Sequence, residues 1–393
     1  MSGATLTASF NGVRTSPAAQ NAGFRIGTSS SNLTKTVYSS NLTYNASGQF
    51  SADVTGLDPS TTYYYQAFMT VSDGNGGYVE IVSEVGSFTT KAQGSVSNDY
   101  LAGFGMPDLS GLNPQIRSTG TYSDRDDKWY SYSTNNNNRQ IAVHTYSEGA
   151  PNSAETLNYV VLYDGSKYAP LWTAHTMNST YWPDNNAGRN ESWTNDPAIS
   201  LTQQTGLDNA GSVGYSKGHL VASDYRQTSV KQNKQTFYYS NQAPQWQDSF
   251  NGGIWNSLEN RVKAATPSGT TMMYVITGVL YEGSITYKSS GSLSVPIPSH
   301  FYKCIMKCTF NGSTITGAQG IAFVYTNEAH SGNYYDDAYV TSIDAIETRA
   351  GFNFFAAVPE NLQNSAEANT NHQWFSGVTS PSSVASPTVS RNR

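Results

Sequence analysis

Three short segments decide the fold of this chain: Tyr215-Ser-Lys-Gly-His219, Asn241-Gln-Ala-Pro-Gln245 and Asn251-Gly-Gly-Ile-Trp255-Asn-Ser-Leu-Glu259. In the first, a glycine before the histidine lets the backbone approach a neighbour closely. The second reads as the turn that ends a short strand. The third predicts an amphipathic helix that opens at Asn251, with Asn251, Trp255 and Glu259 along one stripe.

Each segment is weak evidence when it is taken alone. A single histidine is more often a plain surface or core residue, and an asparagine at a helix start commonly caps the helix. The order and spacing of all three, however, resemble the DNA/RNA non-specific endonucleases, the ββα-metal family. The signature of that family is D-R-G-H, then N-x-x-P-Q and N-x-G-x-W-x-x-L-E.

The resemblance extends to both sides of these segments. It covers about residues 99–375 and includes Gly188–Pro197, Tyr274–Gly278, Pro298–Lys303 and Ile346–Phe355. Gly188–Pro197 looks like the arginine segment ahead of an Asp-Pro pair in the family. The resemblance implies an α+β ββα-metal nuclease domain with a mixed antiparallel sheet core.

Two positions depart from the family pattern. Ser216 and Lys217 stand where the family has Asp and Arg. The acidic group that would orient water near the metal is therefore missing, although a serine hydroxyl still forms hydrogen bonds. Lysine keeps the positive charge but loses the two-pronged geometry of arginine. We expect activity to survive both changes.

The resemblance assigns catalytic roles to His219, Arg189, Asn241 and Glu259, and the role of metal ligand to Asn251. His219, neutral near pH 7, would take a proton from the attacking water. Asn251 would give a neutral oxygen ligand to one largely hydrated Mg²⁺ ion, with Mn²⁺ as the alternative. Glu259 would hold waters of that ion. Arg189 would bind the phosphate as its charge builds.

Three further residues are expected to bind the substrate, which is DNA or RNA, and Asn241 acts beside them. Asn241 would orient either His219 or the substrate. Lys217 and Arg226 would contact phosphate groups. Gln245 is placed with them as a substrate-binding candidate, although the residue pattern favours a structural role for it over a catalytic one.

Charge is distributed unevenly along the chain. The net charge of −6 and the pI of about 5.5 argue against a general attraction to nucleic acid. Between Lys217 and Lys263, however, six basic residues face three acidic ones. This local excess predicts a phosphate-binding surface whose affinity falls with added salt.

Composition sets the broad class. The chain has 393 residues, of which 37% are hydrophobic, 12% aromatic and only 13% charged, which excludes a disordered protein. No apolar run approaches the roughly 18 residues of a membrane span, and the start shows no signal peptide. A surface rich in Tyr, Asn, Ser and Thr predicts a secreted, extracellular protein in its mature form.

The N-terminal part of the chain has a different sequence pattern from the nuclease domain. Residues 4–91 read as short strands separated by turns, which is typical of a β-sandwich. In Gly56–Ala67, Tyr63 and Tyr65 face one way, and such a tyrosine can anchor a corner between two sheets. This part resembles a fibronectin type III domain. The predicted organisation is therefore an all-β sandwich over 1–91, a linker over 92–98, the nuclease domain over 99–375 and a Ser/Pro-rich tail over 376–393.

Strands of the nuclease domain are predicted at 139–146, 157–164, 169–177, 236–240, 272–281, 301–310 and 320–326, with helices after Asn251 and at 341–348. Cys304 and Cys308 lie on one of these strands. Four residues of strand span roughly 13 Å, too far for a disulfide, so both are expected as small buried residues.

Two other functions stay open. A surface adhesin or carbohydrate-binding protein would use the sandwich and the abundant aromatic residues for a polysaccharide contact. A nuclease scaffold inactivated by Ser216 would keep the fold without the activity.

Overall fold

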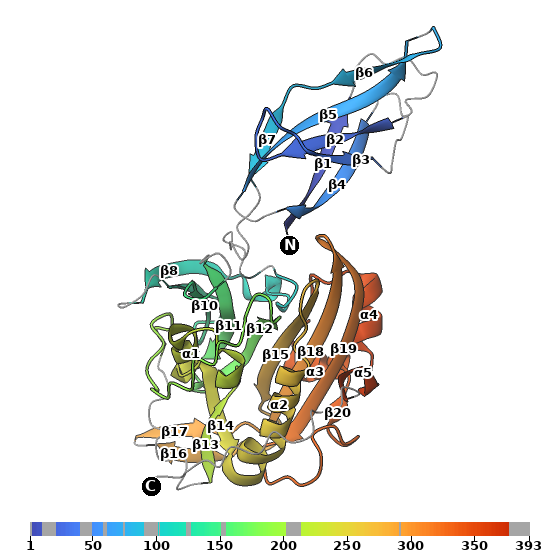
Figure 1. Cartoon of the computed structure of the whole chain (residues 1–393). Coiled ribbons are helices and arrows are strands. Elements are labelled where there is room, and N and C mark those ends of the chain that lie inside the picture. The colour runs from blue at the N-terminus through green and yellow to red at the C-terminus, as the bar shows by residue number, and fades with distance from the viewer. Residues whose placement is uncertain are drawn as a thin grey trace. The chain divides into compact units, whose positions relative to one another are not determined.

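A computed structural model describes residues 2–9, 21–39, 49–57, 61–73, 75–89, 101, 103–122, 127–150, 155–201, 214–290 and 292–376. The chain divides into two compact units, mainly residues 1–96 and residues 97–309 with 317–393 (Figure 1). The predicted linker at 92–98 and the tail beyond residue 376 lie outside the described residues. The exact domain boundaries therefore stay a prediction.

The N-terminal unit is a β-sandwich, as predicted. One sheet pairs β1 (Ser2–Ser9) with β4 (Gln49–Leu57). The other contains β2 (Asn21–Gly27), β3 (Lys35–Tyr38), β5 (Thr62–Ser72), β6 (Tyr78–Val82) and β7 (Gly86–Thr89). Phe50 and Val54 of one sheet share a buried core with Phe24, Ile26 and Tyr63 of the other. Strand β6 was not predicted, because all five of its residues are exposed and show no alternation of polarity.

A large sheet forms the second unit. In the described part of the chain it has nine strands in the order β20-β19-β18-β15-β12-β11-β10-β9-β8. Their bounds are β8 Gln115–Thr121, β9 Lys128–Ser133, β10 Arg139–Tyr146, β11 Thr156–Asp164, β12 Ala169–Met177, β15 Thr271–Leu280, β18 His300–Asn311, β19 Thr314–Thr326 and β20 Val340–Thr341. The central pairs from β10 through β18 are antiparallel.

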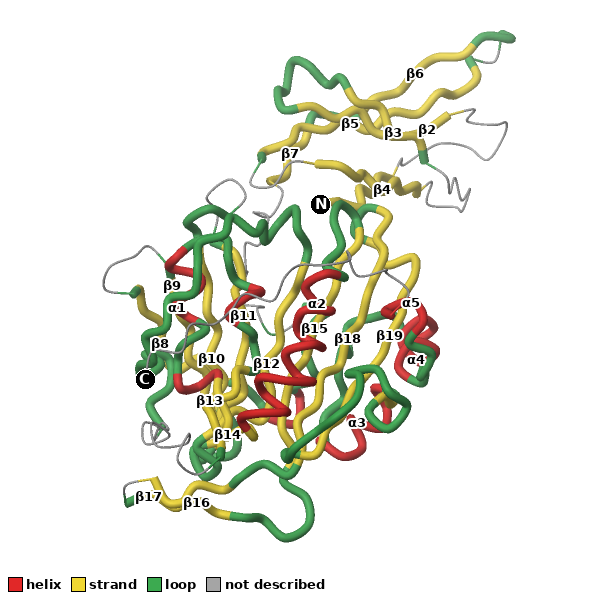
Figure 2. Tube along the Cα trace, turned by 60° about the horizontal axis from the view of Figure 1, so that its bottom comes forward, coloured by secondary structure: helices red, strands yellow, loops and turns green. Residues whose placement is uncertain are grey.

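Two strand pairs and several helices flank this sheet. They are β13 (Tyr215–His219) with β14 (Gln242–Trp246), β16 (Tyr287–Ser290) with β17 (Leu293–Pro296), and the helices α1 (Val230–Gln235), α2 (Asn256–Ala264), α3 (Ile343–Ala350), α4 (Glu360–Glu367) and α5 (Gln373–Ser376). Helix α2 lies across the sheet over β15 and β18 (Figure 2). Its residues Leu258 and Val262 share a buried core with Val275 of β15 and with Phe301 and Ile305 of β18.

Most of the predicted strands are confirmed, and one is wrong. Residues 236–240 follow helix α1 and enter a 3-10 turn at Tyr239–Asn241. The Asn241 side chain donates to the Thr236 carbonyl at 2.8 Å, which closes this segment on itself instead of pairing it in a sheet. Cys304 and Cys308 are buried and free in β18, as expected.

Within the described ranges, none of the helices combines the length and the apolar character that crossing a membrane requires.

Candidate active site

Two antiparallel strands and a helix carry the three segments that decided the fold. Ser216 of β13 faces Gln245 of β14, and His219 faces Gln242. A Cβ atom at Gly218 would lie 2.4 Å from the Gln245 side-chain oxygen, so only glycine fits there without rearrangement. The side chain of Gln245 is buried against this glycine. Its packing fits the structural role, and it leaves the predicted substrate contact without support.

The imidazole of His219 sits among aromatic rings. Its centroid lies 4.8 Å from that of Trp193 and 4.9 Å from that of Phe237, which meets it edge-on. Its Nε2 atom is buried without a hydrogen-bond partner among the described residues. Burial, assisted by the charge of Arg189, lowers the pKa of His219 to about 3. The ring is therefore neutral at pH 7.

Two cations flank the same aromatic rings. The exposed Arg189 guanidinium lies 4.9 Å from the Phe237 ring centroid and donates to Ser223 Oγ at 3.0 Å. The Lys217 ammonium lies 5.5 Å from the Trp193 ring centroid. Rings and cations together form an aromatic-cationic cluster around His219, suited to a phosphate group. The rings were missed as site residues, because no local pattern shows that Trp193 and Phe237 meet a histidine.

Asn251 does not open helix α2, so that prediction is wrong. It lies in a π-helical segment, Gln247–Trp255, and α2 begins only at Asn256. Gly253 has φ −112° and ψ −109°, a break that interrupts the expected stripe of side chains. Asn251 Nδ2 donates to Ser216 Oγ at 2.7 Å, and Oδ1 has no hydrogen bond to the described protein.

Glu259 lies on α2 and interacts electrostatically with Lys303, a residue without a predicted role. Burial raises the pKa of its carboxyl, while the charge of Lys303 opposes that shift. Lys303 of β18 is fully buried, donates to Thr277 Oγ1 at 2.9 Å and lies 4.7 Å from the Trp255 ring centroid. Burial lowers the pKa of Lys303. The sequence assigned no role to this lysine, although a buried ammonium needs a countercharge.

Two oxygens of the site fit a hydrated divalent cation. Asn251 Oδ1 is a neutral amide oxygen without a protein donor, and Glu259 Oε1 is a buried carboxylate oxygen without one in the described part of the chain. Mg²⁺ keeps several of its waters and needs only a few such oxygens. The residues present therefore fit the metal that the sequence predicts.

Asn241 holds the backbone behind His219. Its side chain is fully buried, accepts from the Val221 amide at 2.9 Å and donates to the carbonyls of Val221 and Thr236. The Leu220 amide donates to the Asn241 carbonyl at 3.1 Å. These bonds leave no atom for substrate, so of its two predicted roles the geometry favours positioning of the His219 strand.

The predicted substrate contact of Arg226 does not fit the structure. The guanidinium is buried and donates to the carbonyls of Tyr225, Asn158 and Thr176 at 3.0–3.2 Å. Burial lowers its pKa to about 10, so it remains charged at pH 7. A charge count along the sequence cannot distinguish a buried arginine that donates hydrogen bonds to backbone carbonyls from an exposed arginine.

The excess of positive charge between Lys217 and Lys263 is also not a continuous surface. Of its six basic residues, Arg226 and Arg261 are buried, Lys231 pairs with Glu148, and Lys263 pairs with Asp184 and Asp224. Of the other two, Lys217 belongs to the aromatic-cationic cluster, and Lys234 is half-buried in helix α1.

Comparison with known proteins identifies the family of this chain. Residues 136–361 match the DNA/RNA non-specific endonuclease family. The chain belongs to this family. The prediction of an enzyme that hydrolyses phosphodiester bonds with the help of a metal is confirmed at the level of the family.

Relatives of this nuclease come from bacteria and eukaryotes. A nuclease of Nostoc sp. (strain PCC 7120 / SAG 25.82 / UTEX 2576) is 27% identical over 54% of this chain and 77% of its own length. The mitochondrial nuclease EXOG of Homo sapiens is 28% identical over 50% of this chain and 55% of its own. The mitochondrial nuclease 1 of Schizosaccharomyces pombe is 26% identical over 51% and 65%. The chain thus spans less than two thirds of these two eukaryotic relatives.

One chain of a solved EndoG/EndoGI complex is 26% identical in sequence to this chain. The match covers 52% of this chain and 85% of that one, with a TM-score of 0.45. That score is too low to support an argument about the fold.

The comparisons correct two predictions. Secretion is contradicted, because the human and fission yeast relatives are named mitochondrial nucleases. A weakly charged polar surface carries no information about cellular location, which is why the prediction from composition was wrong. Residues 7–90 match the N-terminal domain of purple acid phosphatases, so the sandwich is supported but its fibronectin type III identity is not.

Burial of Arg226 leads to a prediction about stability. Replacing Arg226 with methionine removes the hydrogen bonds that its buried guanidinium donates to three carbonyls, so we expect a loss of about 3 kcal/mol in the free energy of unfolding. Urea titration measures this loss, and plasmid cleavage per folded molecule should stay near the wild-type rate. Unchanged stability with weakened substrate binding would restore the original assignment.

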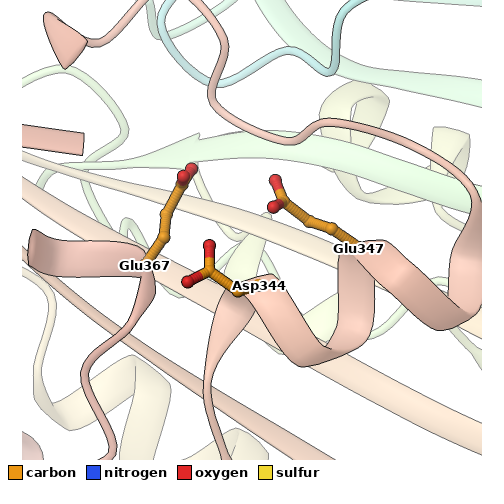
Figure 3. A group of neighbouring side chains, drawn as sticks. All are labelled: Asp344, Glu347 and Glu367. Atoms are coloured by element: carbon orange, nitrogen blue, oxygen red, sulfur yellow. The ribbon is translucent and has the colours of Figure 1, made fainter. Parts of the chain in front are cut away.

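A second group of acidic residues lies away from the predicted metal ligands. Asp344 and Glu347 of α3 and Glu367 of α4 point toward one another (Figure 3), with ligand atoms within 4.8 Å. Burial raises the pKa of Glu347 to about 7, and burial with the charge of Glu347 raises that of Glu367 to about 8. None of these three acidic residues was predicted as a site residue.

This acidic group predicts a pH-dependent stability. Folded Glu367 keeps its proton up to about pH 8, whereas the unfolded chain loses it near pH 4.5, so stability falls as the pH rises between these values. We expect a loss of about 2 kcal/mol from pH 5 to pH 8.5. Glu367→Gln should flatten this dependence in thermal unfolding, while Asp337→Asn, at an exposed position, should leave it unchanged. An equal slope in both variants would contradict the assignment.

Proposed function

We propose that the chain is a Mg²⁺-dependent endonuclease that hydrolyses both DNA and RNA with little sequence preference. The observation that carries this proposal is the neutral imidazole of His219 beside the exposed Arg189, with an Nε2 atom that has no hydrogen-bond partner among the described residues. Ser216 of the same strand binds Asn251 of the π-helical segment Gln247–Trp255. Base, phosphate-binding cation and metal ligand are the groups that phosphodiester hydrolysis requires.

In the proposed reaction, His219 accepts a proton from a water molecule as the water oxygen attacks phosphorus. The new P–O bond forms while the bond to the leaving 3′ oxygen breaks, and that oxygen takes a proton from solvent water to leave as a hydroxyl group. Arg189 and Lys217 stabilise the negative charge that builds on the phosphoryl oxygens. A bound Mg²⁺ ion, held by Asn251 with Glu259 nearby, would supply further charge neutralisation at the phosphate.

The same arrangement accounts for low sequence preference. The cations of the aromatic-cationic cluster suit the phosphate backbone, and backbone contacts carry no direct sequence information. The half-buried Trp193 ring is suited to stacking, which tolerates every base, and the buried Phe237 ring packs against it. Both DNA and RNA present these features.

Purified full chain with supercoiled plasmid, and separately with RNA, tests the proposal. We expect nicking and then degradation of both substrates in Mg²⁺, with EDTA stopping the reaction and with cleavage ends spread over many sequences. Inactivity in Mg²⁺ and in Mn²⁺ on both substrates would favour the inactive scaffold.

A further inference from the structure

Ser216 stands at the centre of a short chain of hydrogen bonds. Its hydroxyl donates to the carbonyl of Gln245 at 3.3 Å and accepts from Asn251 Nδ2 at 2.7 Å. A carbonyl oxygen can only accept, so the single proton of the hydroxyl is committed to Gln245. The lone pairs of Ser216 Oγ are therefore left for Asn251.

This commitment determines which end of the Asn251 amide faces Ser216. Rotating the amide by a half-turn would place Oδ1 against Oγ with no proton between the two oxygens. The NH₂ group must face Ser216, and Oδ1 is held on the other side, where no described residue donates a hydrogen bond to it. The direction comes from the sheet, because the β13–β14 register places Ser216 opposite Gln245.

We propose that Ser216 is a positioning residue that presents Asn251 Oδ1 to the divalent cation. The inference rests on the proposed function, in which Asn251 is the metal ligand. An aspartate at this position, as in the family pattern, would also accept from Nδ2 but could not donate to the Gln245 carbonyl when ionised. Serine therefore orients the amide with a neutral group and does not mark a damaged site.

Titration calorimetry with Mg²⁺ alone, on the full chain without nucleic acid, tests this role. Ser216→Ala should weaken Mg²⁺ binding about 10-fold, the size typical for loss of a group that orients a ligand. Ser216→Thr keeps the hydroxyl and should bind within about 2-fold of wild type, by the same reasoning. In plasmid cleavage, Ser216→Ala should need more Mg²⁺ for half-maximal rate and recover most of its rate when Mg²⁺ saturates.

The outcomes separate this inference from the function on which it rests. Equal Mg²⁺ affinity in wild type and folded Ser216→Ala would overturn the positioning role and leave the nuclease proposal intact. Failure of the threonine variant to restore affinity would also overturn it. Unchanged Mg²⁺ binding in Asn251→Ala would instead show that Asn251 is not the ligand, and the proposed metal site would fail first.

Discussion

Replacing His219 with alanine should lower the rate of plasmid hydrolysis about 10³-fold at saturating Mg²⁺. The ring contacts Trp193 and Phe237 and is neutral at pH 7, because burial and Arg189 lower its pKa to about 3. Without it, the attacking water loses the group that accepts its proton. Initial rates of nicking, measured with excess enzyme, report this loss.

A matched histidine gives the control for this variant. His372 lies beside Tyr335, far along the chain from the proposed site, and His372→Ala should keep the wild-type rate. Both variants need circular dichroism spectra like that of the wild type. Full activity of a folded His219→Ala protein would remove His219 from the mechanism.

Replacing Asn251 with alanine should lower kcat/KM about 10³-fold at a fixed, moderate Mg²⁺ concentration, which is within the range that charge stabilisation contributes in such sites. Asn251 Oδ1 is the neutral oxygen that the structure leaves without a protein donor, so its loss removes the proposed protein ligand of the cation. Rates measured over a series of Mg²⁺ concentrations should also show a higher Mg²⁺ requirement.

Asn364, exposed on helix α4, offers the comparison for this second variant. Asn364→Ala should match wild type in both rate and Mg²⁺ requirement. If Asn251→Ala loses rate but keeps the wild-type Mg²⁺ requirement, the asparagine acts on the substrate and not on the metal.

Short spacing along the chain explains why much of the site was predictable. His219 ends β13, Gln245 lies on its partner strand, and Glu259 follows on α2, so their positions depend on local structure. The start of the helix at Asn251 was predicted wrongly, because the backbone breaks at Gly253 before α2 begins at Asn256.

Residues from distant segments could not be placed in the same way. Lys303 reaches Glu259 only because α2 packs across β18, and Trp193 reaches His219 from a separate loop. Arg226 shows the opposite error, because a basic residue near the motif turned out to hold buried carbonyls. Tertiary packing, which no single segment encodes, decides all three cases.

We propose that one Mg²⁺ site, built on β13, β14 and the helical segment from Gln247 to Ala264, supports phosphodiester hydrolysis. The most direct test measures Mg²⁺ binding by calorimetry and Mg²⁺-dependent plasmid cleavage on the same metal-free preparation. We predict one ion bound per chain, no cleavage before Mg²⁺ is added, and loss of both binding and cleavage in Asn251→Ala. Cleavage at full rate in the metal-free protein, or binding that Asn251→Ala leaves unchanged, would contradict it.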